Sequence, residues 1–346
     1  MRYSTPKTKK VNKNVNKNKN ANTSFDKAME KAVKSLSKAV KIGGSLNPTE
    51  LINGGGKKKT QKTQVDLDSC NPANNTKKTC YTFQALQQIA KGWNMEHPSD
   101  LIKIPKIESE TNKNILWDNI DHKLKFICNT EVCWMDQNFS PKLTEGEMEK
   151  MFRPKMPRSW RKNKYEWLSS VDIDKVMKQY EAKYQDFKFM GPSPIDFDYE
   201  YQKDKCIVNE LCHIDINNLM NRGVKKVGVI FNLDTHDKPG SHWVALYLDL
   251  NKKSVYYFDS YGNSPPNEVE VLIERIQEQA RKLGFEIDYQ YNQVRHQYEN
   301  SECGVYSIYF IIQLLEHKKT FNDIQKNRIT DNFMNNKRKY YFLKGH

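Results

Sequence analysis

The chain has 346 residues and a formal net charge of +14, with 37% hydrophobic, 28% charged and 11% aromatic residues. This apolar content is enough for a sizeable core, which excludes collagen-like, disulfide-scaffold and wholly disordered proteins. The longest unbroken apolar runs are only a few residues long, whereas a membrane-spanning helix needs roughly 18 to 20. Because the N-terminus lacks an apolar signal region, we expect a protein that is not secreted and has no transmembrane segment.

The positive charge is concentrated at the N-terminus. Residues 1–62 contain 16 Lys or Arg and 3 Asp or Glu, and so carry +13 of the formal charge. We predict a basic, largely disordered leader that contacts nucleic acid, an anionic surface or an acidic protein, or that only aids solubility. Apolar residues at helical spacing over residues 25–40 predict a short amphipathic helix, which docks on a membrane or partner or packs on its own protein.

A folded body follows the leader. We predict an N-terminal accessory region at residues 63–160, packed on a C-terminal domain at residues 161–346. Helices are predicted at residues 81–88 and 145–151, and the basic, proline-broken residues 153–164 are typical of a connector.

The cysteines do not suggest a disulfide framework. They number seven, which is odd, and no secretory signal accompanies them. Zinc requires several Cys or His ligands at short spacing, and neither Cys128 with Cys133 nor the group Cys206, Cys212 and His213 supplies a full set. We therefore expect ordinary thiols, with no metal and no cofactor. The seven are Cys70, Cys80, Cys128, Cys133, Cys206, Cys212 and Cys303.

The C-terminal domain alternates helical and strand patterns. Apolar spacing predicts a helix at residues 171–184. Three strands are predicted at residues 226–233, 241–250 and 254–259. Because all three are apolar on both faces, they indicate a buried central sheet.

The remaining elements lead to one strongly apolar helix. Asn267 with Glu270 predicts a capping box that starts a helix ending at Leu283. A strand is predicted at residues 285–293. The last helix begins at Cys303 and is apolar on nearly every face, so we expect it to be buried.

Three polar residues lie where predicted elements begin or end, and Gln297 precedes the last of them. His242 opens a strand, Asp259 ends the next strand of the same hairpin, and Cys303 starts the buried helix. A helix N-terminus and an imidazolium both favour a thiolate, so Cys303 can act as a nucleophile, with His242 as its base and Asp259 orienting the imidazole. Gln297 and the Cys303 amide can stabilise an oxyanion by about 3 to 4 kcal/mol per donor. Gly304 leaves room for a substrate backbone. Taken singly, each residue also has an ordinary structural interpretation.

The segments SHWVALYLDLNKKSVYYFDSYG and HQYENSECGVYSIYF resemble the clan CE cysteine proteases, which include the SUMO (ubiquitin-like-protein-specific) proteases and adenain. As in that family, Asp259 follows His242 by 17 positions and Cys303 follows Gln297 by 6. The resemblance covers residues 165–320. It implies an α+β, papain-like or adenain-like core, with a central mixed sheet flanked by helices and the nucleophile at the start of a buried helix. It also implies a His242–Asp259–Cys303 triad with Gln297 as oxyanion donor.

The resemblance also implies a substrate channel. Trp167 and Trp243 match two tryptophans that flank a narrow tunnel for a Gly-Gly tail in the family; the alternative is that both are core residues. Two positions depart from the pattern. Ser169-Ser170 replace Asn-Asp, which weakens the case for a ubiquitin-like substrate, and Glu302 stands where Asp is usual.

The basic leader, the accessory region and the Asn- and Lys-rich composition resemble the capsid-maturation thiol proteases of large nucleocytoplasmic DNA viruses. This implies a cysteine endopeptidase that processes viral structural or core proteins at Gly-Gly-X sites, in the virion and in the virus factory of the host cytoplasm. Ile42-Gly43-Gly44-Ser45 would then be a self-cleavage site after Gly44; otherwise it belongs, with Gly54–Gly56, to a flexible linker. The alternatives are a deconjugating protease for a ubiquitin-like modifier, an acetyltransferase, and a non-catalytic binding protein.

Overall fold

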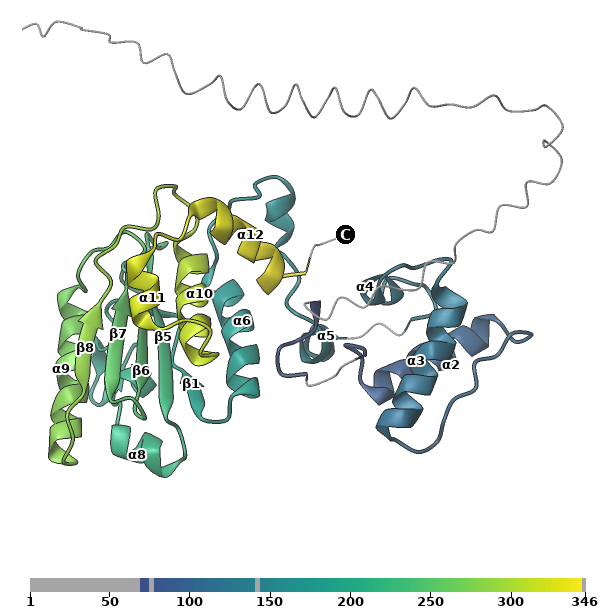
Figure 1. The fold of residues 1–346 in the computed structure, drawn as a ribbon, viewed down its shortest axis with the longest axis horizontal. Helices are drawn as coiled ribbons and strands as arrows, with labels where there is room; N and C mark the ends of the chain where they lie inside the picture. The colour runs from purple at the N-terminus through teal and green to yellow at the C-terminus, as the bar shows by residue number, and fades with distance from the viewer. Residues whose placement is uncertain (1–68, 75–77, 141–143, 344–346) are drawn as a thin grey trace, which may run out of the picture. The chain divides into compact units, whose positions relative to one another are not determined.

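A computed structural model describes residues 69–74, 78–140 and 144–343 of the chain (Figure 1). The predicted leader, with its amphipathic helix at residues 25–40, lies outside the described residues, and so do the glycine breaks that follow it. Within the described ranges, no helix combines the length and the apolar character that crossing a membrane requires.

The sheet is built around the three strands that the sequence predicts. β5, β6 and β7 are antiparallel neighbours, and parallel partners flank them, β1 beside β5 and β8 beside β7. Every side chain of β6 is buried, which places this strand at the centre of the sheet. The strands are β1 (Phe187–Phe189), β2 (Ser193–Pro194, also paired with β5), β5 (Lys226–Asn232), β6 (Trp243–Asp249), β7 (Ser254–Phe258) and β8 (Asp288–Tyr291), while β3 (Glu200–Gln202) and β4 (Lys205–Cys206) form a separate hairpin.

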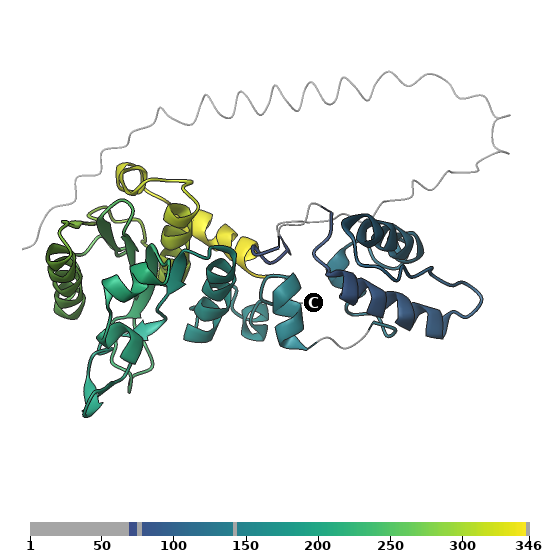
Figure 2. The ribbon, with the colours of Figure 1, turned by 90° about the horizontal axis from the view of Figure 1, so that it is seen from below.

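Helices cover both faces of the sheet (Figures 1 and 2). Successive side chains of β6 point to opposite faces, so Ala245 and Tyr247 pack with α6 and α10, whereas Leu246 and Leu248 pack with α9. The mixed α+β architecture is therefore confirmed. The helices of this part are α6 (Ser170–Lys183), α7 (Asn209–Cys212), α8 (Ile216–Asn221), α9 (Asn267–Lys282), α10 (Cys303–Leu315), α11 (Phe321–Lys326) and α12 (Asp331–Tyr341), with a 3-10 turn at Arg158–Arg161.

Helix α10 is the buried helix that the sequence predicts. Each of its residues except Gln313 is buried. It packs closely on β5 at Gly228, where a Cβ atom would lie 2.9 Å from the ring of Phe187 and 3.1 Å from Ile311. Since Cys303 is the first residue of α10, this packing fixes where its thiol lies.

The residues that precede the connector form a hydrophobic cluster of their own, joined by Leu343 from the C-terminal end. Its helices are α2 (Phe83–Glu96), α3 (Glu110–Leu124), α4 (Glu131–Trp134) and α5 (Glu145–Met151). The helices predicted at residues 81–88 and 145–151 are thus confirmed, although α2 runs further. Helix α3 was missed because Asn, Lys and Asp residues separate its buried side chains. The domain boundary at residue 160 stays a prediction.

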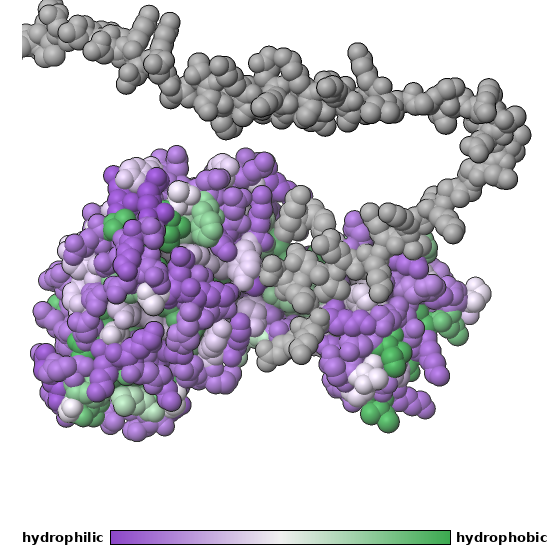
Figure 3. Space-filling model, viewed as in Figure 1, coloured by the Kyte–Doolittle hydropathy of each residue, from purple (hydrophilic) through white to green (hydrophobic). Residues whose placement is uncertain are grey.

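The outer surface is that of a water-exposed protein. Figure 3 shows a face on which hydrophilic side chains dominate and hydrophobic ones are scattered. Large exposed apolar side chains are spread along the described chain, among them Met95, the neighbours Phe126 and Ile127, and Trp167. Single exposed apolar residues are normal on the surface of a folded protein.

The expectation that the cysteines are ordinary thiols is wrong for six of the seven. Disulfides join Cys70 to Cys80, Cys128 to Cys133 and Cys206 to Cys212. Each pair is separated by 10 residues or fewer, and the intervening turns bring the Cα atoms to 5.0, 5.6 and 6.3 Å, within the range that a disulfide spans. Cys303 is the free cysteine of the described chain.

The predicted capping box at Asn267 and Glu270 is also wrong. Helix α9 begins at Asn267, but its N-cap is Pro266, which makes no side-chain capping bond. A proline side chain has no hydrogen-bond acceptor, so it cannot supply the capping bond that a capping box requires. The strand predicted at residues 285–293 is shorter in the structure, where β8 spans Asp288–Tyr291.

Two helical glycines give a matched test of packing. At Gly92 in α2, a Cβ would lie 1.8 Å from the Phe139 carbonyl oxygen, whereas at Gly146 in α5 nothing lies within 4 Å. We expect Gly92→Ala to lower the free energy of unfolding by about 1 to 3 kcal/mol and Gly146→Ala to raise it by up to about 1 kcal/mol. Denaturant unfolding measures both, and equal stabilities for the two variants would contradict this packing.

Candidate active site

Strand pairing brings His242 and Asp259 together. His242 immediately precedes β6 and Asp259 immediately follows β7, and in this antiparallel hairpin Ala245 is paired with Phe258. The start of one strand and the end of the other therefore lie at the same edge of the sheet. His242 Nε2 lies 2.7 Å from Asp259 Oδ1, and both residues are buried. The pairing that the sequence predicts is confirmed.

The Asp259 carboxylate is held from several sides. The Tyr261 backbone N–H donates to Oδ1 at 2.9 Å and the Asn263 side-chain amide donates to Oδ2 at 2.8 Å. The Asn292 amide donates to the Asp259 main-chain carbonyl at 2.9 Å. With both carboxylate oxygens engaged, the carboxylate has little freedom to rotate away from His242.

The environment of His242 favours its protonated form. Burial lowers the pKa of His242, but hydrogen bonds with Asp259 and with the Cys303 thiol, and the negative charges of both groups, outweigh burial and raise the pKa to about 9. Because Nε2 faces Asp259, Nδ1 is the ring nitrogen left for Cys303. The Tyr261 ring stacks on the imidazole with a centroid separation of 4.6 Å and limits its rotation.

Cys303 lies where the sequence places it. It is the first residue of α10, it is buried, and its thiol is free. The N-terminus of a helix carries a partial positive charge that favours a thiolate. Ser307, one turn later, donates its hydroxyl to the Cys303 carbonyl at 3.0 Å, which strengthens the first turn.

Gln297 is fully buried beside Asp259. Its Oε1 accepts the Ser260 hydroxyl at 2.6 Å, and its backbone N–H donates to the Ser260 carbonyl at 2.9 Å. These contacts fix which end of the side-chain amide is the donor. One amide hydrogen goes to the Glu299 carbonyl at 2.9 Å, and a primary amide has a second.

The two predicted tunnel tryptophans have different surroundings. Trp167 is 44% exposed, whereas Trp243 is 7% exposed and donates its indole N–H to the Leu168 carbonyl at 3.0 Å. Gly304 is close-packed on the side where a side chain would lie. A Cβ at Gly304 would lie 3.1 Å from Leu168 and 3.3 Å from Trp243, so its absence permits α10 to pack closely against these residues. A role of Gly304 in substrate binding stays a prediction.

Sequence reasoning missed three residues that support the site. Ser260 orients the Gln297 amide, Tyr261 stacks on His242, and Asn292 anchors the main chain at Asp259. Ser260 and Tyr261 directly follow Asp259, so their position was a usable signal. Asn292 lies 33 residues further along the chain and carries no local signal.

A second cluster offers metal-ligand atoms. Among the described residues, Cys206, Cys212 and His213 place theirs within 4.8 Å of one another. Both sulfurs belong to one disulfide, and zinc binds cysteine as the thiolate. In this oxidised form, the cluster does not provide a zinc site.

A free thiol at a helix start, an imidazole whose pKa that thiol raises and a carboxylate bonded to the imidazole are the groups of a papain-like cysteine peptidase. Comparison with known proteins agrees. A family model described as "Ulp1 protease family, C-terminal catalytic domain" matches residues 175–345. R355 of Acanthamoeba polyphaga mimivirus, which is named as a thiol protease, is 34% identical over 299 residues, covering 80% of this chain and 93% of R355.

The cysteine protease pS273R of African swine fever virus is 31% identical over 206 residues, covering 57% of this chain and 73% of pS273R. A crystal structure of pS273R shares the fold, with a TM-score of 0.54 and 23% identity over 80% of this chain and 96% of that one. The chain therefore belongs to the Ulp1 protease family and is a cysteine peptidase.

The charge state of His242 can be measured directly. We expect its imidazole to titrate with a midpoint of about 9 in an NMR titration of labelled histidines. In Asp259→Asn the midpoint falls, because burial still lowers it while the carboxylate no longer raises it. The signal is assigned by its disappearance in His242→Gln.

The same pKa shift predicts a change in stability. Because the pKa of His242 is higher in the folded protein than its ordinary value of 6.5, protonation of His242 stabilises the fold. This stabilisation is fully present below pH 6.5 and is lost as the pH rises through about 9. The free energy of unfolding should therefore fall over this interval, and less so in His242→Gln. A wild-type midpoint at or below 6.5 would contradict both expectations.

Proposed function

We propose that the chain is a cysteine endopeptidase that cleaves after Gly-Gly, with Cys303, His242 and Asp259 as its catalytic triad. The observation that carries the proposal is the His242 imidazole held 2.7 Å from the Asp259 carboxylate, with the free, buried thiol of Cys303 at the start of α10 raising the pKa of the same imidazole. A His242 pKa of about 9 keeps the imidazolium protonated at neutral pH, which favours a thiolate beside it.

The chemistry proceeds in two steps. The Cys303 sulfur attacks the peptide carbonyl carbon, a C–S bond forms, and the C–N bond breaks as the His242 imidazolium gives its proton to the leaving amine. Water then attacks the thioester, and His242 takes a proton from it. The C–S bond breaks, which releases the acid and restores the thiolate. Asp259 keeps the imidazole in the orientation that serves both steps.

An oxyanion forms in each step and needs hydrogen-bond donors. The second amide hydrogen of Gln297 is one candidate, because Ser260 fixes the orientation of that amide. The backbone N–H of Cys303 is another, since amides in the first turn of a helix lack an intrahelical acceptor. Donors of this kind contribute about 3 to 4 kcal/mol each to transition-state stabilisation.

Preference for Gly-Gly rests on the family resemblance and on the tryptophan beside the site. Trp167 exposes its ring next to Leu168, which is buried against Gly304. A narrow channel beside such a ring admits glycine more easily than residues with side chains. Trp243, held by its indole bond to Leu168, would form the inner wall of this channel.

The biological setting that we propose is virion maturation. The similar proteins R355 and pS273R come from large DNA viruses. Processing of structural or core proteins would take place in the virion and in the virus factory of the host cytoplasm. Residues 1–62, with a net charge of +13, would contact nucleic acid or another anionic surface there.

The main alternative is removal of a ubiquitin-like modifier. It is favoured by the name "SUMO-1 cysteine protease" given to pS273R in several African swine fever virus isolates. The chemistry is the same, so only the substrate distinguishes the two functions. Comparison of modifier–fluorophore conjugates with Gly-Gly-X peptides, at equal enzyme concentration, separates them.

A cleavage assay tests the mechanism. We expect wild type to cleave a fluorogenic Gly-Gly-X peptide, and we expect Cys303→Ala and His242→Ala to lower kcat/KM by about a thousandfold or more. His122→Ala, which changes an exposed histidine in α3, serves as the matched control and should keep full activity. Wild-type-like cleavage by purified Cys303→Ala would remove the mechanism.

The chain carries a candidate site of its own at Ile42-Gly43-Gly44-Ser45. This segment lies outside the described residues, so the proposal of cleavage after Gly44 rests on sequence alone. We expect intact-mass measurement to show wild type without residues 1–44 and Cys303→Ala at full length. Identical full-length masses for both would end this proposal.

A further inference from the structure

One face of α12 carries three polar residues that point into the protein. Asp331, Asn335 and Arg338 are spaced by four and three positions, so they lie on the same side of the helix. Asp331 is 6% exposed and Arg338 is 2% exposed. Buried charged side chains are rare and costly unless they are fully hydrogen-bonded, so the contacts of this face call for an explanation.

Arg338 joins two segments that border the site. Its Nη2 donates to the Ser301 carbonyl at 2.6 Å, two residues before Cys303. Its Nη1 donates to the Glu166 carbonyl at 2.7 Å, next to Trp167. The planar guanidinium makes both bonds at once, so it fixes the distance between the start of α10 and the Trp167 segment.

Asn335 adds a second contact to the same segment. Its amide donates to Glu302 Oε1 at 2.9 Å, and its Oδ1 accepts from Arg338 Nε at 3.2 Å. Glu302 is buried and also accepts from the backbone N–H and the hydroxyl of Ser301. Ser301 and Glu302, the two residues before Cys303, are therefore both bonded to α12. Ser301 is bonded through its main-chain carbonyl and Glu302 through its side chain.

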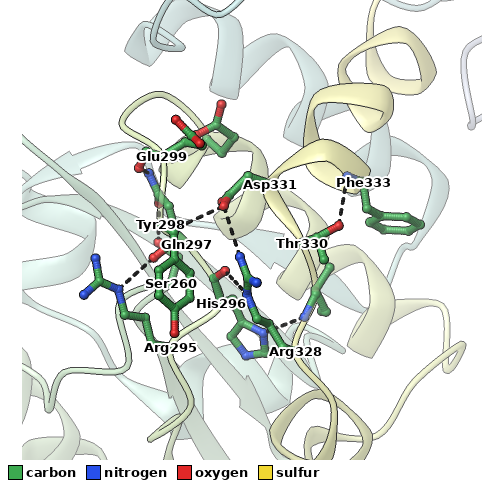
Figure 4. Close-up of polar contacts among 12 residues, drawn as sticks. Ser260, Arg295, His296, Gln297, Tyr298, Glu299, Arg328, Thr330, Asp331 and Phe333 are labelled. Carbon is green, nitrogen blue, oxygen red and sulfur yellow. Dashed lines mark hydrogen bonds and ion pairs between the residues drawn. The ribbon is translucent and has the colours of Figure 1, made fainter. Parts of the chain in front are cut away.

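Asp331 bonds to the loop that carries Gln297. Its Oδ2 accepts the Tyr298 backbone N–H at 3.1 Å, one residue after Gln297, and its Oδ1 accepts the Tyr306 hydroxyl at 3.1 Å. Arg328 donates to Asp331 at 3.4 Å and to the His296 carbonyl at 3.0 Å. Figure 4 shows the contacts of Asp331 with Tyr298 and Arg328, and that of Arg328 with His296, beside Gln297 in the same loop.

These contacts are not required to form α12 itself. Thr330 already caps the helix by accepting the Phe333 N–H. Apart from the Arg328 bond, Asp331 directs its bonds to the Gln297 loop and to α10, and Arg338 directs two of its three to main-chain carbonyls outside α12. Burial lowers the pKa of Arg338, and the negative charges of Glu302 and Cys303 oppose that effect.

We propose that Asp331 and Arg338 are positioning residues, through which α12 aligns the oxyanion loop at Gln297 with the start of α10 at Cys303. The inference rests on the proposed function, because it assigns Cys303 as nucleophile and Gln297 as donor. The two residues have separable effects: Arg338 acts on the nucleophile, whereas Asp331 acts on the oxyanion donor.

Arg338 is tested by Arg338→Met and Arg338→Lys in the full chain. Met loses the cation and both carbonyl bonds, while Lys keeps the cation but not the two-pronged geometry. We expect kcat on a Gly-Gly-X peptide to fall about a hundredfold for Met and about tenfold for Lys, with a smaller change in KM. The rate of Cys303 alkylation by iodoacetamide should fall with kcat, and its pH profile should shift in Arg338→Met. Arg275→Lys in α9 is the control, because it loses a comparable bond to a main-chain carbonyl, that of Cys212 in α7.

Asp331 is tested by Asp331→Asn, which keeps one acceptor oxygen of two. We expect kcat to fall about tenfold. The alkylation rate should stay at the wild-type value, because alkylation involves no oxyanion and the oxygen that Asn retains can still accept the Tyr306 hydroxyl of α10. Hydrogen–deuterium exchange over residues 295–299 should become faster. Asp118→Asn, an exposed change in α3, is the matched control.

All rates are measured at a temperature well below the thermal unfolding midpoint of each variant and are expressed per folded enzyme molecule. Variants that lower the midpoint but keep wild-type kcat, alkylation and loop exchange would reduce both residues to a structural role and overturn the inference. If wild type does not cleave Gly-Gly-X peptides, the proposed function fails by itself. In that case the rate of Cys303 alkylation still tests the role of Arg338, and the rate of hydrogen–deuterium exchange over residues 295–299 still tests the role of Asp331.

Discussion

The buried hydrogen bond between His242 and Asp259 is the contact on which the rest of the site depends. It joins the start of β6 to the end of β7, so the register of one hairpin sets its 2.7 Å length. A shift of one residue in that register would turn every side chain of the strand to the other face. The apolar side chains on both faces of β6 oppose such a shift, since they belong to two separate clusters. Core packing and site geometry therefore have the same origin.

The remaining groups are brought to this pair by a loop and a helix rather than by strands. Gln297 is tied to Ser260, the neighbour of Asp259, and Cys303 is carried by the buried helix that packs on the sheet. Loops need support if a site is to keep its geometry. Here the support comes from α12, whose buried face bonds to the main chain on both sides, at Tyr298 and at Ser301.

Some distances that decide packing are not visible in the sequence. Gly304 adjoins Cys303, and only the structure shows that Leu168 lies 3.1 Å from where a Cβ would be. The disulfides were not predicted, because compartment and cysteine number do not show whether the turns between each pair bring the Cα atoms to a bonding distance.

The sequence by itself determined the strands β5 to β7, the buried helix at Cys303 and the order and spacing of His242, Asp259 and Cys303, because periodicity and short-range spacing are local properties. Only the tertiary structure decided which residues support them. Arg338 reaches a carbonyl 172 positions away, and Asp331 reaches an amide 33 positions away. Contacts to main-chain atoms place no demand on the identity of the partner residue, so no pattern in the sequence records them.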